Sequence, residues 1–120
     1  MKLNERISYV TGLLKHHGFR DVILKAFRPG PLPTVGWYRI EALTSGHRVL
    51  ITEFISRSVV KYSYTLISGS EVLLRYDNAP HHPHISTHPH HKHEGERVAP
   101  LEDPSIESFL REVSSIISRK

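Results

Sequence analysis

Cysteine is absent from the 120-residue sequence, and so are long hydrophobic runs. Without cysteine the chain forms no disulfide framework and no thiolate zinc site, and it fits a reducing, cytoplasmic setting. Lys, Arg or Ser interrupts the longest apolar segments, so none approaches the length of a membrane-spanning helix. The first ten residues, MKLNERISYV, carry charges where a signal peptide needs an apolar core. We therefore expect a cytoplasmic protein with no membrane partner.

What the chain has in excess is positive charge and histidine. Its net charge is +4 with neutral histidines and its pI is about 9.6, and both values suit an anionic partner. Ten histidines occur in the sequence, and seven of them lie between His81 and His93. The length fits one domain, residues 1–120, with a core that is stable without disulfides. Any chemistry of this domain is therefore expected to concentrate in the histidine-rich segment.

Hydrophobic spacing predicts a helix, then a sheet, then a second helix. Apolar residues recur at helical intervals in residues 1–18, where Gly18 provides a C-terminal stop. Residues 19–77 contain five segments of β-forming residues, at 19–27, 35–43, 47–55, 59–67 and 71–76. Short turns separate the last four segments, which predicts antiparallel hairpins in a meander. Residues 78–100 are rich in proline and histidine and are expected to form a loop.

The final helix is predicted at residues 104–119, with Asp103 as N-cap and Pro104 at its first position. Its apolar stripe, which must be buried, consists of Ile106, Phe109, Leu110, Val113, Ile116 and Ile117. The expected fold class is α+β. A four- to five-stranded antiparallel meander sheet is packed by an N-terminal and a C-terminal helix, with a long His/Pro-rich loop. An exposed edge strand often pairs with another copy, so a homodimer is one expected assembly.

The histidine-rich segment has the residue types that metal-independent cleavage of RNA requires. A base takes the proton of the 2′-hydroxyl, an acid protonates the leaving 5′-oxygen, and a cation stabilises the charged phosphorus centre. Imidazole titrates near neutrality and serves as acid or base without a cofactor, while Arg75 and Lys92 supply positive charge. Strand alternation gives Arg75 and Asp77 the same face. The candidate catalytic histidines are His81, His82, His90, His91 and His93.

Glu53 is a second candidate, because it is a carboxylate on an apolar strand face. Alternation places it among valine and isoleucine side chains, where an unpaired carboxylate is costly. It is therefore interpreted as an orienting carboxylate or a general base that faces the histidines. The alternatives are an edge position or an ion pair with Arg75 or Lys61 across the sheet.

The segment KYSY, residues 61–64, is a candidate for substrate contact. Its lysine and serine share one strand face, and its two tyrosines share the other. Cations and aromatic rings on a sheet suit RNA, since phosphates attract the cations and bases stack on the rings. Tyrosine is also a common strand former, so the rings alternatively serve only the core. The candidate contacts are Lys61, Tyr62, Tyr64, Tyr76 and Lys92, and Trp37 is open to the same interpretation.

Two other functions fit the same segment. Imidazoles close in sequence bind zinc, nickel or copper, and His82, His91 and His93 are the candidate ligands of a divalent metal. Such a site belongs to a metal-binding protein or a metal-dependent nuclease, although the spacing matches no standard zinc motif. Alternatively, the protein is a non-catalytic module that binds nucleic acid or a partner.

Several short motifs occur in a fixed order. Glu53 is followed by KYSY at 61–64, by RYDNAPHH at 75–82 and by PHHKH at 89–93. This order resembles the TumE family of prokaryotic toxins over roughly residues 35–118. The resemblance implies the toxin of a two-gene toxin–antitoxin module, neutralised by a small, often helix-turn-helix, antitoxin, with ribonuclease action on mRNA. In that family an aromatic residue often precedes PHHKH, whereas this chain has His88, so His88 is expected to be the least essential of these histidines.

Overall fold

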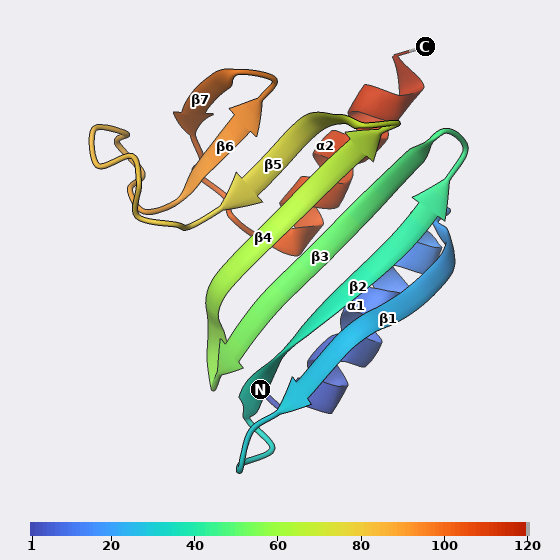
Figure 1. Cartoon of the computed structure of the whole chain (residues 1–120), viewed down its shortest axis with the longest axis vertical. Helices are drawn as coiled ribbons and strands as arrows, with labels where there is room; N and C mark the ends of the chain where they lie inside the picture. Colours follow the sequence, from blue (N-terminus) through green and yellow to red (C-terminus); the bar gives the residue numbers. More distant parts are fainter. Residues whose placement is uncertain (120) are drawn as a thin grey trace.

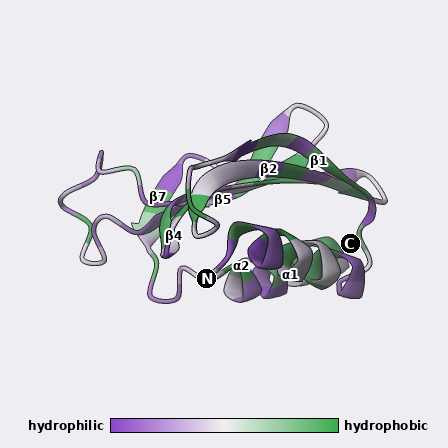
Figure 2. Ribbon diagram, turned by 90° about the horizontal axis from the view of Figure 1, so that it is seen from below, coloured by the Kyte–Doolittle hydropathy of each residue, from purple (hydrophilic) through white to green (hydrophobic). Residues whose placement is uncertain are grey.

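Seven antiparallel strands form one sheet, and both helices pack on the same face of it (Figures 1 and 2). The computed structural model describes residues 1–119. The helices are α1 (Leu3–His16) and α2 (Ile106–Ser118). The strands are β1 (Arg20–Pro29), β2 (Val35–Thr44), β3 (His47–Ser56), β4 (Ser58–Ser68), β5 (Glu71–Asp77), β6 (His91–Glu94) and β7 (Arg97–Pro100). They are neighbours in chain order, so the sheet is a meander.

The α+β class and the first five strands confirm the expectation from hydrophobic spacing. Alternate residues of β2 to β5 point to the face under the helices, the helix face, and form the core with the stripe of α2. Burying each large apolar side chain there contributes about 1.5–3 kcal/mol. The buried side chains of the strands include Tyr38, Ile40, Val49, Ile51, Ile55, Tyr64, Leu66 and Leu74. The other side of the sheet, the open face, carries no helix within residues 1–119 (Figure 2).

The predicted strand number of four to five is wrong, because residues 91–100 form the hairpin β6–β7 instead of a loop. Each of its strands has only four residues, and β6 reads HKHE, with none of the β-branched or aromatic residues that signal a strand. Gly95 turns the hairpin with a φ of 61°, a conformation that glycine adopts without strain. β6 is held in the sheet by backbone pairing with β5, although its own sequence has the polar composition of a loop.

The helix ends follow their capping residues. α1 ends at His16, His17 is its C-cap, and Gly18 follows with a φ of 85°, so the helix stops at the predicted glycine. The predicted N-cap of the final helix is wrong: Ser105 is the N-cap, and its side chain accepts a hydrogen bond from the Ser108 amide. Asp103 instead accepts from the Ser105 amide at 3.2 Å and forms the turn before the helix. Neither α1 nor α2, the helices of the described residues, has the length and hydrophobicity for crossing a membrane.

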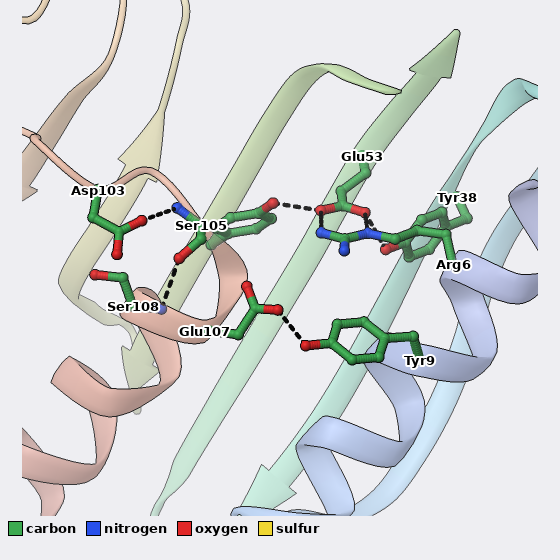
Figure 3. A network of polar contacts seen from close by, with 9 residues as sticks. Arg6, Tyr9, Tyr38, Glu53, Asp103, Ser105, Glu107 and Ser108 are labelled. Carbon is green, nitrogen blue, oxygen red and sulfur yellow. Dashed lines mark hydrogen bonds and ion pairs between the residues drawn. The ribbon is translucent and has the colours of Figure 1, made fainter. Parts of the chain in front are cut away.

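Glu53 lies on the helix face, where it is fully buried and paired (Figure 3). The Arg6 guanidinium of α1 donates two hydrogen bonds to its carboxylate, both at 2.8 Å. The hydroxyls of Tyr38 and Tyr64 also donate to it. The alternative interpretation, an ion pair with Arg75 or Lys61, is therefore wrong, since the cation that pairs with Glu53 is Arg6. This partner comes from a helix 47 residues away, which strand alternation alone does not reveal.

Candidate active site

The site is built on the open face by residues that are opposite one another in neighbouring strands. Directly opposed residues of antiparallel strands share a face and lie close together. Ser63 of β4 is opposite Asp77 of β5, and Asp77 is opposite His91 of β6. In the adjacent row, Arg75 of β5 is opposite His93 of β6. The missed strand β6 is therefore what brings two histidines beside Arg75 and Asp77.

Three imidazoles converge at this point and surround one carboxylate, and we call His82, His91, His93 and Asp77 the histidine cluster. Asp77 Oδ1 lies 3.0 Å from His91 Nε2, and Asp77 Oδ2 lies 3.7 Å from His93 Nε2. The ring centre of His82 lies 4.8 Å from that of His91 and 5.6 Å from that of His93. The predicted convergence of imidazoles beside Arg75 is thus present for three of the five candidate histidines.

His91 is the fixed, buried member of the cluster. Its Nδ1 donates to the carbonyl of Pro89 at 3.0 Å, because a carbonyl oxygen only accepts. Its Nε2 then faces the Asp77 carboxylate, and such a pair is held by a shared proton or by a cation between the two atoms. The residue is only 2 % exposed, so we assign it a positioning role and leave substrate contact to its neighbours.

His82 and His93 are the partly exposed members of the cluster. Desolvation lowers the pKa of His82, and the neighbouring His91 lowers it further. Desolvation also lowers the pKa of His93. The Asp77 carboxylate acts in the opposite direction, but the pKa stays below its ordinary value. A lowered pKa favours the neutral imidazole, which is the form that accepts a proton.

Arg75 supplies positive charge next to His93. Its Nε donates to Thr65 Oγ1 at 3.3 Å, which holds the side chain along the open face. Among residues 1–119, no carboxylate lies within ion-pair distance of the Arg75 guanidinium. A guanidinium without a carboxylate partner is available to a phosphate group.

The loop 78–90, which carries His82, connects β5 to β6 at one side of the sheet (Figure 1). Hydrogen bonds hold this loop at both of its ends. At its start, the Asp77 carboxylate accepts from the Ala79 amide at 3.0 Å. At its end, Thr87 Oγ1 donates to the carbonyl of His90 and accepts from the Leu101 amide at 2.8 Å. The loop is therefore an anchored arm.

Replacing Thr87 with valine should weaken the attachment of this arm, because valine has nearly the shape of threonine but no hydroxyl for these two hydrogen bonds. The variant leaves the Leu101 amide and the His90 carbonyl without their partner, which costs about 1–3 kcal/mol of unfolding free energy. Chemical denaturation measures the loss. Ser86→Ala, at the exposed neighbour, is the matched control and should stay within about 0.5 kcal/mol. A Thr87→Val protein as stable as the parent protein would contradict this role of the hydroxyl.

A groove of about 580 Å³ on the open face adjoins the histidine cluster through Asp77. It crosses β2, β3, β4 and the end of β5, and its lining contains two cations and three large aromatic residues. The lining residues are Trp37, Arg39, Thr52, Phe54, Lys61, Tyr62, Ser63, Asp77, Asn78, Ala79 and Pro80. Lys61 lines this groove together with Ser63, with which it shares a strand face.

Several candidate residues lie away from this site. The Tyr76 hydroxyl and the Lys92 ammonium bind Glu112 of α2, so both side chains point to the helix face. Tyr64 and Tyr76 are buried there, so their rings are not exposed on the open face beside the groove. Tyr62 does line the groove, but it is buried, and its hydroxyl forms a 2.8 Å hydrogen bond with His90.

His90 is thereby held on the tyrosine side, and it does not join the three clustered rings. His81 is exposed on the loop outside the cluster. Glu53 belongs to the separate buried network with Arg6. Sequence reasoning also missed Arg39 and Phe54, although alternation with buried neighbours was the signal that puts both on the open face.

The cluster has the composition of a metal site as well. One ring nitrogen from each of His82, His91 and His93 can be chosen so that all three lie within 4.8 Å of one another. Imidazole nitrogens and a nearby carboxylate are ligands that zinc and other divalent transition metals prefer. The hydrogen bond from His91 to the Pro89 carbonyl is also the kind that orients a ligating imidazole. These residues could therefore hold a metal ion.

Comparison with known proteins gives one result. The family model described as Toxin TumE matches residues 12–119, nearly the whole chain. No curated protein and no solved structure matches the chain. The match includes every residue of the histidine cluster and of the groove.

Proposed function

Because the chain belongs to the TumE toxin family, and so is a toxin component of a toxin–antitoxin system, we propose that it is a metal-independent endoribonuclease. The observation that carries this proposal is the position of two partly exposed imidazoles, His82 and His93, around Asp77 and beside the free Arg75 guanidinium. Acid, base and cation thus stand together at the end of a groove that contains further cations.

The proposed reaction is transfer of the phosphate within the RNA strand. One imidazole takes the proton of a 2′-hydroxyl, and the 2′-oxygen forms a bond to phosphorus. The bond from phosphorus to the 5′-oxygen breaks, and the other imidazole protonates that oxygen. Arg75 stabilises the negative charge on the phosphorus oxygens. The products are a 2′,3′-cyclic phosphate and a 5′-hydroxyl.

The other two members of the cluster position these imidazoles. Asp77 contacts His91 and His93 through different carboxylate oxygens, so it fixes the orientation of one ring against the other. His91 in turn is held by the Pro89 carbonyl. Such support keeps reacting groups in place, which catalysis by proton transfer requires.

A toxin of this family implies an antitoxin partner. We propose that the antitoxin is a small helix-turn-helix protein encoded beside the toxin. In that case, expression of the chain arrests growth, and coexpression of the neighbouring protein restores it.

Removal of metal tests the proposed mechanism. Cleavage of a single-stranded RNA by the purified protein should proceed at an unchanged rate in excess EDTA, since no step uses a metal. Addition of EDTA to a nuclease of known magnesium dependence controls for effective chelation. A rate that collapses in EDTA and returns with zinc or manganese would remove the metal-independent mechanism.

The second candidate is a metal-binding protein or metal-dependent nuclease, favoured by the proximity of His82, His91 and His93. Elemental analysis of protein purified without a metal-affinity column separates the two. A stoichiometric metal that is lost in His82→Ala and retained in His90→Ala would support this candidate. Protein without metal that still cleaves RNA removes it.

A further inference from the structure

The groove beside the histidine cluster has features that the cleavage chemistry does not use. Trp37 and Phe54 lie opposite each other on β2 and β3, and Phe54 is 40 % exposed on the open face. Resting on the proposed ribonuclease function, we propose that this groove binds single-stranded RNA. Unpaired bases stack on Trp37 and Phe54, and the strand runs across the sheet to the histidine cluster.

The aromatic residues give the groove its affinity for unpaired bases. A base exposes its flat face only when it is not in a duplex, and its stacking on an aromatic ring is tolerant of sequence. The guanidinium of Arg28 lies 6.0 Å from the centre of the Trp37 ring and so adds a positive charge to the same end of the groove. Phe54 is exposed and Trp37 is half-buried opposite it, so the two form a contiguous apolar patch, and such a patch rimmed by polar residues marks a binding surface.

The charges of the groove match a phosphate backbone. Lys61 follows Phe54 across the sheet and Arg39 follows Trp37 along β2. Within residues 1–119, neither cation has a carboxylate at ion-pair distance. Asp77 is the single carboxylate among the described lining residues, and it is engaged by His91 and His93. The same cations would also attract an acidic protein. The aromatic rings favour RNA over such a partner, because unpaired bases stack on them.

The geometry leads a bound strand to the reacting groups. Three strand spacings separate β2 from β5, a distance of about 14 Å. At its far end the groove meets Asp77 and therefore the cluster. The side chain of Asn78, which lines that end, is already engaged with the backbone of Tyr62 and Val60. Its amide is thus not free to read base edges, and the groove binds bases with little sequence preference.

Fluorescence of Trp37 tests this directly, because it is the only tryptophan in the sequence. The probe is a fully 2′-O-methylated oligonucleotide, which lacks the nucleophilic hydroxyl and cannot be cleaved. Titration with the single strand should quench the fluorescence, and the same strand annealed to its complement should bind at least tenfold more weakly. Phe54→Ala should weaken binding of the single strand by about 5- to 150-fold. Leu43→Ala, an exposed apolar residue on the same face outside the groove lining, should leave binding unchanged.

Lys61→Ala gives an independent readout that does not depend on the aromatic residues. The logarithm of the binding constant should fall less steeply with the logarithm of salt concentration, by about 0.7 for one lost phosphate contact. Circular dichroism of each variant confirms that the fold is intact. The inference is overturned if single strand and duplex bind equally, if Phe54→Ala binds as the parent protein does, or if only the antitoxin changes the fluorescence. Quenching without cleavage of ordinary RNA would instead retain this groove and remove the nuclease.

Discussion

Alanine at His93 is expected to lower the rate of RNA cleavage by about 10²- to 10⁴-fold, because it removes one of the two proton-transferring groups. The same loss is expected for His82→Ala. Losses of this kind are not additive when two residues act as a unit, so the double variant should be little worse than either single one. Single-turnover cleavage of a labelled RNA measures the rates, and growth of cells expressing each variant measures toxicity.

The control for this prediction is another histidine of the same arm. His88 is exposed and lies outside the cluster, so His88→Ala should retain cleavage and toxicity. Binding of the 2′-O-methylated strand should remain in His93→Ala, since this residue is not part of the groove lining. If the double variant of His82 and His93 still arrested growth and cleaved RNA, the proposed catalytic roles would be wrong.

Methionine at Arg6 is expected to lower the free energy of unfolding by about 3–5 kcal/mol. The change removes both hydrogen bonds to Glu53 and leaves a fully buried carboxylate without its cation. Burial and the Glu53 carboxylate raise the pKa of both Tyr38 and Tyr64, so the two hydroxyls that also bind Glu53 stay protonated and neutral. They donate hydrogen bonds to Glu53 but supply no positive charge in place of Arg6. Urea denaturation measures this free energy.

A nearby contact of the same helix is the matched control. Tyr9 lies one turn after Arg6, is exposed, and donates to Glu107 at the surface (Figure 3). Tyr9→Phe should change stability by no more than about 0.5 kcal/mol. An Arg6→Met protein as stable as this control would show that the network contributes little to the fold. Because Glu53 lies outside the histidine cluster, the folded fraction of Arg6→Met should cleave RNA at the ordinary rate per molecule.

Periodicity predicted most of the fold because it reports which side chains must be buried. The apolar stripe of α2 and the alternate apolar residues of β2 to β5 can all be buried only when the helix packs on that face of the sheet. The hairpin β6–β7 escaped prediction because its pairing with β5 does not depend on apolar side chains: HKHE offers none. Its formation follows from backbone pairing with Leu74 to Asp77, which no local pattern encodes.

The sequence predicted which types of residue form the candidate site, but not which individual histidines belong to it. The motif segments identified the histidines, Arg75 and Asp77, yet spacing could not separate His91 and His93 from His90. One residue of difference in a strand changes the face, and β6 directs His91 and His93 to the open face and Lys92 to α2. The sequence also did not reveal the partner of Glu53. That partner, Arg6, belongs to α1, and the pattern of the strands does not predict where this helix packs.

The chemical ends of the cleaved RNA test the central claim most directly. Mass spectrometry of fragments produced by the purified protein in EDTA should find a 2′,3′-cyclic phosphate on one fragment and a 5′-hydroxyl on the next. These ends arise when imidazoles move the protons and the 2′-oxygen attacks phosphorus. Fragments with 5′-phosphate ends, formed only when metal is present, would contradict the account.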